Sequence, residues 1–257
     1  MQNENWIWGF HSLEACLENS PEVIFEILIE QKSGESVDAE MKRLMGAADL
    51  LGVKTRVVPR LPRLLDEKRT QGVAALLKEF PEKTLSEVEE KLMEVPDSSI
   101  AARQWLLLDG IQDPRNFGAL LRSAAAFDVS GVFIRDRHQC PPNGVVAQAS
   151  AGALFRIPIV VCSTFNPVFK VVENAGIRIL GLAADGLPLN QVLPNKREGQ
   201  SVMWILGGEG GGIRPGLREK CHAQASIPMR DDVESLNASV AASIAFFVAS
   251  QKLGSKN

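Results

Sequence analysis

Polar residues between Asp113 and Arg122 could bind an anion. Asp113 followed by Pro114 is typical of a helix start, because Asp caps the first turn and Pro fits its first position. Asn116 would then lie in the first turn, where free backbone N–H groups favour negative charge. Arg122 stands among apolar residues, where a guanidinium is costly unless it pairs with a carboxylate or a phosphate. The alternative is an Arg whose stem packs while its head reaches solvent.

A run of glycines at residues 207–212 forms a second candidate binding segment. Glycine lets the backbone approach a ligand closely and adopt positive φ. The run has no Lys after Gly212 and no G-x-G-x-x-G spacing, so it fits neither common phosphate-binding loop. Glu209 inside the run would repel a phosphate but could accept hydrogen bonds from a ribose or lie beside a sulfonium. The run therefore favours a ligand of that kind.

A third polar segment, residues 226–241, leads into an apolar helix predicted over residues 242–249. Ser235, Asn237 and Ser239 are of types that cap helices. Capping alone would explain these three residues. A role in contacting a ligand is the other interpretation.

The carboxyl-terminal part of the chain alternates apolar runs with helical patterns. Such alternation predicts a parallel sheet covered by helices, so we expect an α/β fold. In open parallel sheets, ligands bind beyond the carboxyl ends of the strands, which is where the polar segments follow the runs. The predicted strands are residues 105–108, 131–134, 157–161, 178–183 and 201–206.

The first 80 residues are predicted to form a smaller α/β module. A helix that contains Leu13 and Leu17 is expected to begin at Ser12, which could cap it. The other expected elements are strands at residues 23–29, 53–58 and 73–77 and a helix at residues 38–51.

An acidic stretch separates this module from the rest of the chain. Within it, Thr84 and Glu87 have the spacing of a capping box, which predicts a helix. We therefore expect a domain of residues 1–80, a linker at residues 81–100 that contains this helix, and a second domain of residues 101–257.

The charge balance bears on the class of partner. The formal net charge is −3, whereas nucleic-acid-binding domains are usually basic. Residues 54–69, however, hold six cations against two anions, and this stretch could contact phosphates. The alternative is a solvated face of a small domain. The cations are Lys54, Arg56, Arg60, Arg63, Lys68 and Arg69.

Several classes of protein and site are disfavoured. No window holds the roughly 18 apolar residues that cross a bilayer, and the amino terminus lacks a signal-peptide pattern, so we expect a cytoplasmic protein without a membrane partner. The four cysteines include no C-x-x-C pair and the three histidines have no metal-ligand spacing, so no metal is expected. Residues 148–152 lack the first glycine of a nucleophile elbow, which disfavours a hydrolase.

The three polar segments together resemble the signature motifs of the SpoU (TrmH) family in the SPOUT superfamily of RNA methyltransferases. The residues that carry the resemblance are Asp113, Pro114, Asn116, Gly118 and Arg122, then Gly207, Glu209 and Gly212, and then residues 227–229 and 235–241. Residues 146–153 are similar to the family's segment between the first two motifs. Residues 8–15 and 71–73 are similar to the ribosomal-protein-like substrate-binding domain of one subgroup.

This resemblance implies an S-adenosylmethionine-dependent enzyme that methylates a ribose 2′-hydroxyl in RNA, a guanosine of large-subunit ribosomal RNA in that subgroup. It implies a parallel sheet flanked by helices with a carboxyl-terminal trefoil knot, a small amino-terminal domain, and a homodimer packed through the catalytic domain. The implied catalytic residues are Asn116, Arg122, Glu209, Ser235 and Asn237. The implied cofactor contacts are Gly207, Gly208, Glu209, Gly212, Ile227, Met229, Ser235, Leu236 and Ala238. The expected RNA contacts are Lys54, Arg56, Arg60, Arg63 and Arg69.

Asn116 and Arg122 occupy the positions of the family's catalytic pair. Because a guanidinium is not deprotonated at ordinary pH, we expect Arg122 to stay cationic, to clamp an RNA phosphate and to stabilise a developing alkoxide. Asn116, Ser235 and Asn237 would orient the ribose, and Glu209 would hold Asn116 or Arg122 in place. RNA is the expected substrate because DNA has no 2′-hydroxyl.

The chain departs from the family pattern at two positions, since Phe155 stands where Glu is common and Gln148 lies where Lys is frequent. Three other functions stay open. The chain could methylate transfer RNA, could be a non-catalytic RNA-binding protein on the same scaffold, or could be an α/β enzyme for a small molecule. The acidic net charge would suit the last of these, and the cationic stretch at residues 54–69 argues against it.

Overall fold

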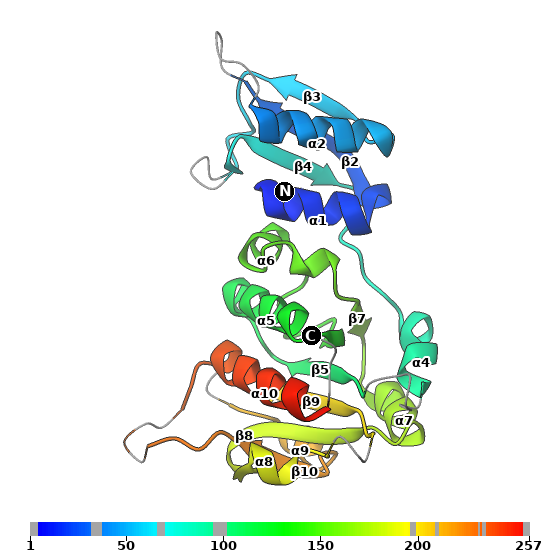
Figure 1. Cartoon of the computed structure of the whole chain (residues 1–257), viewed down its shortest axis with the longest axis vertical. Helices are drawn as coiled ribbons and strands as arrows, with labels where there is room; N and C mark the ends of the chain where they lie inside the picture. Colours follow the sequence, from blue (N-terminus) through cyan, green and yellow to red (C-terminus); the bar gives the residue numbers. More distant parts are fainter. Residues whose placement is uncertain are drawn as a thin grey trace. The chain divides into compact units, whose positions relative to one another are not determined.

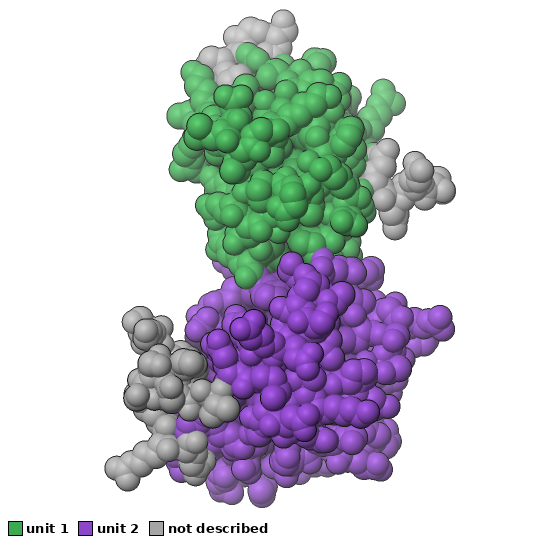
Figure 2. All heavy atoms as spheres, turned by 90° about the vertical axis from the view of Figure 1, so that its right-hand side faces the viewer, with its two compact units in different colours: residues 1–81, 142–156 green, residues 82–141, 157–257 purple. Residues whose placement is uncertain are grey.

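The computed structural model describes residues 5–31, 38–65, 70–94, 102–195, 199–208, 211–230, 232 and 235–253. The chain forms two compact units (Figures 1 and 2). The amino-terminal unit contains residues 1–81 and 142–156, and the carboxyl-terminal unit contains residues 82–141 and 157–257. One segment of the amino-terminal unit therefore comes from the middle of the chain.

A four-stranded sheet in the order β1-β4-β2-β3 organises the amino-terminal unit. Strands β2 and β3 are parallel, whereas β4 is antiparallel to both β1 and β2. The elements are β1 (Trp6–Trp8), α1 (Phe10–Asn19), η1 (Pro21–Val23), β2 (Ile24–Glu30), α2 (Ala39–Leu50), β3 (Thr55–Val58), β4 (Val73–Leu77), α6 (Gly144–Ala149) and η2 (Ala153–Phe155).

The elements predicted for this unit are confirmed, with two corrections. Asp38 caps α2, because its side chain accepts a hydrogen bond from the backbone N–H of Met41 at 2.7 Å. Ser12 does not cap α1, since that helix begins at Phe10 and Ser12 is buried inside it. Strand β1 is absent from the predicted set because three residues are too few to show a strand's alternation.

Two glycines let residues 142–156 pack closely against β1 and α1. A Cβ at Gly144 would lie 2.1 Å from the carbonyl oxygen of Trp6, and one at Gly152 would lie 2.5 Å from that of His11. Gly152 also has a φ of +82°, which glycine adopts without strain. The similarity to the family at residues 146–153 thus falls on a segment whose small residues serve packing.

A six-stranded sheet in the order β10-β8-β9-β5-β6-β7 organises the carboxyl-terminal unit. Every pair of neighbouring strands is parallel, which confirms the predicted parallel sheet. The elements are α4 (Leu85–Met93), β5 (Gln104–Asp109), α5 (Pro114–Ala126), β6 (Val129–Arg135), β7 (Ile159–Cys162), α7 (Asn166–Asn174), β8 (Arg178–Pro188), α8 (Leu189–Val192), β9 (Val202–Gly207), α9 (Pro215–Arg218), β10 (Ala223–Ser226) and α10 (Ala238–Leu253). All five predicted strands are present, and the short β10 is an addition.

Helices cover both faces of this sheet. Trp105 of β5 belongs to a core that α4 and α7 complete on one face. Toward α5 and α10, the Gln104 amide donates to the carbonyl oxygens of Phe127 and Phe246, both at 3.2 Å, and accepts from the indole N–H of Trp204 at 3.1 Å. Because this buried amide is fully used, it fixes both helices to the sheet without an unsatisfied polar group.

The capping box predicted ahead of α4 is confirmed. The backbone N–H of Thr84 donates to the Glu87 carboxylate at 2.7 Å. Val88 and Leu92 of this helix belong to the same core as α7. The helix expected within residues 81–100 therefore packs on the carboxyl-terminal unit.

Within the described residues, no helix is long and apolar enough to span a bilayer, and no group of three His, Cys, Asp or Glu side chains could hold a metal ion. All four cysteines are free. Burial, with a smaller contribution from Glu22, raises the pKa of the Cys16 thiol to about 12, so this thiol stays protonated and unreactive at neutral pH.

Candidate active site

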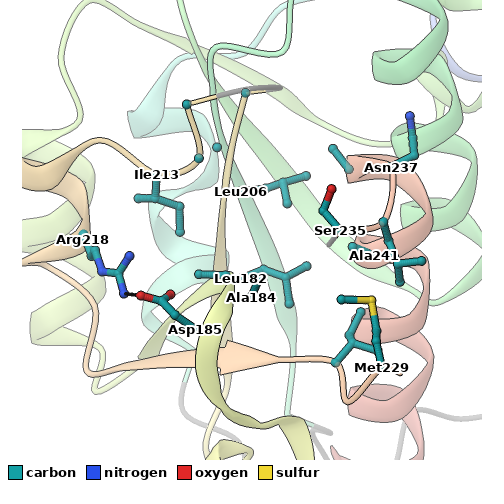
Figure 3. Close-up of a pocket in the computed structure, with 18 residues that line it drawn as sticks. Leu182, Ala184, Asp185, Leu206, Ile213, Arg218, Met229, Ser235, Asn237 and Ala241 are labelled. Atoms are coloured by element: carbon teal, nitrogen blue, oxygen red, sulfur yellow. Dashed lines mark hydrogen bonds and ion pairs between the residues drawn. The ribbon is translucent and has the colours of Figure 1, made fainter. Parts of the chain in front are cut away.

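A cavity of about 690 Å³ opens at the carboxyl ends of β8, β9 and β10 and at the start of α10 (Figure 3). This is the position expected for a ligand site in an open parallel sheet. The residues that line it are Leu182, Ala183, Ala184, Asp185, Leu206, Gly207, Gly208, Gly211, Gly212, Ile213, Arg218, Ile227, Met229, Ser235, Leu236, Asn237, Ala238 and Ala241.

The structure brings the second and third polar segments together around this cavity. Every described residue of the expected cofactor set lines it. They are Gly207, Gly208, Gly212, Ile227, Met229, Ser235, Leu236 and Ala238. Glu209, which belongs to both the cofactor and the catalytic sets, lies outside the described residues.

An irregular stretch of β8 supplies one wall that the sequence did not predict. Gln224 of β10 pairs with Gly181, but the next residue, Ala225, pairs with Leu187. Residues 182–186 therefore leave the ladder between two consecutive partners, and residues 182–185 of this excursion line the cavity. The predicted strand ended near residue 183 because an apolar run carries no signal for a change of register.

In the glycine turn after β9, backbone segments lie in direct contact with one another. A Cβ at Gly207 would lie 2.0 Å from the carbonyl carbon of Gly212, and one at Gly208 would lie 2.4 Å from the carbonyl oxygen of Gly110. Gly212 has a φ of +60°. The backbone N–H of Gly208 donates to the carbonyl oxygen of Asp109 at 2.9 Å. Gly207 and Gly208 therefore have no room for a side chain, and the positive φ of Gly212 favours glycine there.

A buried ion pair closes the same turn. The Asp109 side chain is only 3% exposed, and its carboxylate accepts from Nε of Arg214 at 2.7 Å and from a second guanidinium nitrogen. The hydrogen bond with Asp109 raises the pKa of Arg214. Arg214 lies two residues after Gly212, so Asp109 holds the beginning of the turn through a backbone bond at Gly208 and its end through Arg214. Neither Asp109 nor Arg214 was among the predicted site residues.

Asn237 links the cavity to α5. Its side-chain oxygen accepts from the backbone N–H of Ser239 at 2.9 Å and from the Ser239 hydroxyl at 2.6 Å, which confirms the predicted cap of α10. Its amide nitrogen donates to the side-chain oxygen of Asn116 at 3.3 Å. Because the cap uses the oxygen, the amide nitrogen is directed toward Asn116. Capping thus explains the contacts of the side-chain oxygen of Asn237 but not the contact of its nitrogen. Ser235 is exposed at the cavity wall.

Arg122 lies on the exposed face of α5. Its neighbours Leu120, Leu121 and Ala124 are buried, but the helix turns Arg122 away from them. Within the described part of the chain, no hydrogen bond or ion pair of its guanidinium is recorded. Of the two interpretations of Arg122, the one in which its head group reaches solvent describes this structure. The structure joins Asn116 to Asn237 but does not join Arg122 to either.

The cations expected to contact RNA are partly used within the fold. Lys54 and Arg56 both pair with Glu26, whose side chain is 9% exposed, at 3.3 and 2.6 Å. The hydrogen bond from Arg56 is the largest of the effects that lower the pKa of Glu26. Arg60 and Arg63 are exposed, whereas Arg69 lies outside the described residues. One buried carboxylate therefore offsets part of this positive stretch.

An ion pair between Asp185 and Arg218 lies in the cavity wall, and the sequence did not predict it. Nη2 of Arg218 lies 2.6 Å from Oδ2 of Asp185, and this hydrogen bond lowers the pKa of Asp185. Figure 3 shows the pair on the opposite side of the cavity from Ser235 and Asn237. Asp185 follows an apolar run, and that position after a predicted strand was the available signal.

Comparison with known proteins matches two successive parts of the chain to two families. Residues 103–247 match the SpoU rRNA Methylase family, and residues 6–83 match the family described as RNA 2′-O ribose methyltransferase substrate binding. The chain is 34% identical over 256 residues to the 23S rRNA (guanosine-2′-O-)-methyltransferase RlmB of Xanthomonas campestris pv. campestris, covering 98% of each chain. It is 32% identical to RlmB of Neisseria meningitidis serogroup B, covering 94% of this chain and 93% of that protein.

Solved structures share the fold. The SpoU methyltransferase AviRb of Streptomyces viridochromogenes, in complex with the cofactor AdoMet, matches with a TM-score of 0.74 at 23% identity, covering 99% of this chain and 92% of that one. An RNA methyltransferase of the TrmH family from Porphyromonas gingivalis, described as putative, matches with a TM-score of 0.68 at 25% identity, covering 96% and 90%.

Removing either partner of the ion pair at the glycine turn should destabilise the fold, but by unequal amounts. Arg214→Ala leaves the buried Asp109 carboxylate uncompensated and should lower the free energy of unfolding by about 3 kcal/mol. Asp109→Asn leaves only a half-exposed guanidinium, which water can solvate, and should cost about 1 kcal/mol. Urea unfolding at pH 7 measures both values. A larger loss for Asp109→Asn than for Arg214→Ala would contradict this account of the turn.

Proposed function

Because this chain belongs to the SpoU rRNA methylase family, we propose that it transfers the methyl group of S-adenosylmethionine to a ribose 2′-hydroxyl of RNA. The proposed target is a guanosine in large-subunit ribosomal RNA, as the names of the RlmB relatives describe for those proteins. One observation carries the proposal: the described residues of the expected cofactor set line one cavity, and Asn237 at its edge bonds Asn116.

The cavity fits the proposed cofactor. Its volume of about 690 Å³ lies within the range of roughly 300–1,000 Å³ that is usual for small-molecule sites. Leu182, Leu206, Met229 and Ala241 give apolar wall for an adenine ring, and the glycine turn gives open backbone. When bound, S-adenosylmethionine supplies an electrophilic methyl group on a sulfonium. Gly207, Gly208, Gly212, Ile227 and the 235–238 segment would hold it.

The chain's own residues then position the sugar. We assign Asn116, Ser235 and Asn237 to the ribose, because Ser235 and Asn237 line the cavity and the amide of Asn237 bonds Asn116. Arg122 would bind an RNA phosphate with its guanidinium and stabilise the developing alkoxide. Glu209 is assigned to hold Asn116 or Arg122. In-line transfer depends on this alignment of hydroxyl and methyl.

The amino-terminal unit is proposed to select the RNA. Residues 6–83 match a family described as substrate-binding, and Arg60 and Arg63 are exposed there. We assign residues 1–80 to RNA binding, residues 81–100 to a linker and residues 101–257 to methyl transfer. Lys54, Arg56 and Arg69 complete the proposed RNA contacts. The proposed location is the cytoplasm, where ribosomal RNA is available.

A homodimer and a trefoil knot complete the proposal. The outer face of α10 supports a dimer through the catalytic domain, because Phe247 is 50% exposed and Val240 is 47% exposed. Phe247 also packs edge-on against Phe127, with ring centroids 5.7 Å apart, so its ring is held in place on the surface. Exposed apolar groups on a packed helix are typical of a subunit interface. Membership of the family supports the knot in the carboxyl-terminal part.

The methyl acceptor can be tested directly. With labelled S-adenosylmethionine and unmodified large-subunit ribosomal RNA, we expect label at one guanosine, mapped by resistance of the adjoining bond to alkaline cleavage. RNA with a 2′-deoxyguanosine at that site should accept none. Label on a base, or on no RNA, would refute the proposed function.

Asn237 offers a matched pair of variants for the same assay. Asn237→Asp keeps an oxygen for the cap of α10 but loses the amide donor to Asn116, so the single-turnover rate should fall about 10²-fold with little loss of stability. Asn237→Ala should lose both the rate and about 1 kcal/mol of stability. A normal rate for Asn237→Asp would remove Asn237 from the catalytic set.

Arg122 is predicted to act through its charge. Arg122→Lys keeps a cation and should retain more of the single-turnover rate at pH 7 than Arg122→Ala, which should lose about 10²-fold or more. The rate of the Lys variant should then fall as pH approaches the lysine pKa of about 10.4, a limb that wild type lacks. Equal losses in both variants would instead favour base chemistry or two-point geometry of the guanidinium.

The dimer rests on the outer face of α10. Phe247→Asp should shift the sedimentation coefficient from dimer to monomer, because a charge would be buried in the apolar interface. Leu50→Asp, which changes an exposed apolar residue of the amino-terminal unit, is the control and should stay dimeric. A monomeric wild type, or a Phe247→Asp dimer, would overturn the proposed interface.

A further inference from the structure

Two residues carry the charge of the described cavity wall. Asp185 lies in the excursion of β8, and Arg218 ends α9. Every other described residue that lines the cavity is apolar, a glycine, or an uncharged Ser or Asn. Their side chains meet at 2.6 Å on the side of the cavity opposite Ser235 and Asn237 (Figure 3). A charged part of a ligand therefore finds its counter-charges at this end.

The main chains that carry the pair are fixed by one residue of β10. A Cβ at Gly186, next to Asp185, would lie 2.6 Å from the carbonyl oxygen of Gln224, so that backbone packs directly on β10. The side-chain amide of Gln224 donates to the carbonyl oxygen of Arg218 at 3.4 Å. Gln224 thus contacts both segments, and the two charged groups start from defined positions.

The pair itself is open to exchange. The side chains of Arg218 and Asp185 are 42% and 65% exposed. Ion pairs with this exposure contribute little to stability, since water competes for both partners. Arg218 can therefore exchange Asp185 for a carboxylate of a ligand at small cost, and Asp185 can likewise exchange Arg218 for a cationic group of a ligand. This contrasts with Asp109, which is 3% exposed and held by Arg214.

An α-amino acid presents the two matching charges side by side. A guanidinium binds a carboxylate with two parallel hydrogen bonds, and a carboxylate accepts from an ammonium. We propose that Arg218 and Asp185 form the subsite for the amino-acid end of S-adenosylmethionine, with Arg218 on its carboxylate and Asp185 on its ammonium. This inference rests on the proposed function. The uncharged remainder of the wall then serves the adenosine part.

Binding measurements without turnover test the subsite. Calorimetry would compare S-adenosylhomocysteine with 5′-methylthioadenosine, which lacks the amino-acid end. Arg218→Gln and Asp185→Asn should each weaken S-adenosylhomocysteine about tenfold or more, equivalent to about 1.4 kcal/mol, and leave 5′-methylthioadenosine within about twofold. Lys220→Gln removes an equally exposed cation two residues away, paired with Glu173, and should change neither.

Decarboxylated S-adenosylmethionine separates the two roles. It keeps the ammonium, so Asp185→Asn should still weaken it, whereas Arg218→Gln should not. Equal weakening of all ligands in one variant would show a structural role, and unchanged S-adenosylhomocysteine affinity in both variants would overturn the subsite. If the ligand pattern holds but wild type methylates no RNA, the proposed function fails while the subsite stands. If wild type binds neither nucleoside, both fail.

Discussion

A buried carboxylate at the end of a central strand constrains the candidate site. Asp109 is 3% exposed, and an ionised group so placed is tolerated only with a close counter-charge. Arg214 supplies that charge by reaching back across the glycine turn. The turn is consequently held at both ends by one residue of β5, and Gly207 and Gly208 have no room for side chains. Part of the cavity wall is fixed before a ligand arrives, which lowers the ordering cost of binding.

The opposite wall depends on how α10 is attached. The Asn237 oxygen caps the helix, and its nitrogen reaches Asn116 of α5. Farther along, Gln104 of β5 bonds the carbonyl oxygen of Phe246 in the same helix. The cap and the buried amide thus fix α10 at two points, one at the site and one in the core. Site residues supported by such secondary bonds keep their geometry better than residues on loops.

The sequence predicted what short-range physics decides. Apolar runs located five strands, and Asp113 and Asn237 were identified as caps because a cap is local to its helix. The pair of Asp109 with Arg214 was missed because 105 positions separate the residues and only the parallel register of β5 with β9 brings them together. The surroundings of Arg122 were left open between two interpretations for a related reason. Neighbours in sequence do not say which face of a helix a residue occupies.

Local charge, rather than net charge, explains how an acidic chain attracts RNA. Lys54 and Arg56 share one carboxylate, that of Glu26, so the three groups together add a single positive charge. Arg115 and Arg122 are both exposed on α5, and neither guanidinium has a recorded partner in the described part of the chain. Seven residues apart, they share a helix face at about 10 Å along its axis. Since salt screens charge within about 8–10 Å, phosphates respond to such local cations rather than to the net charge of −3.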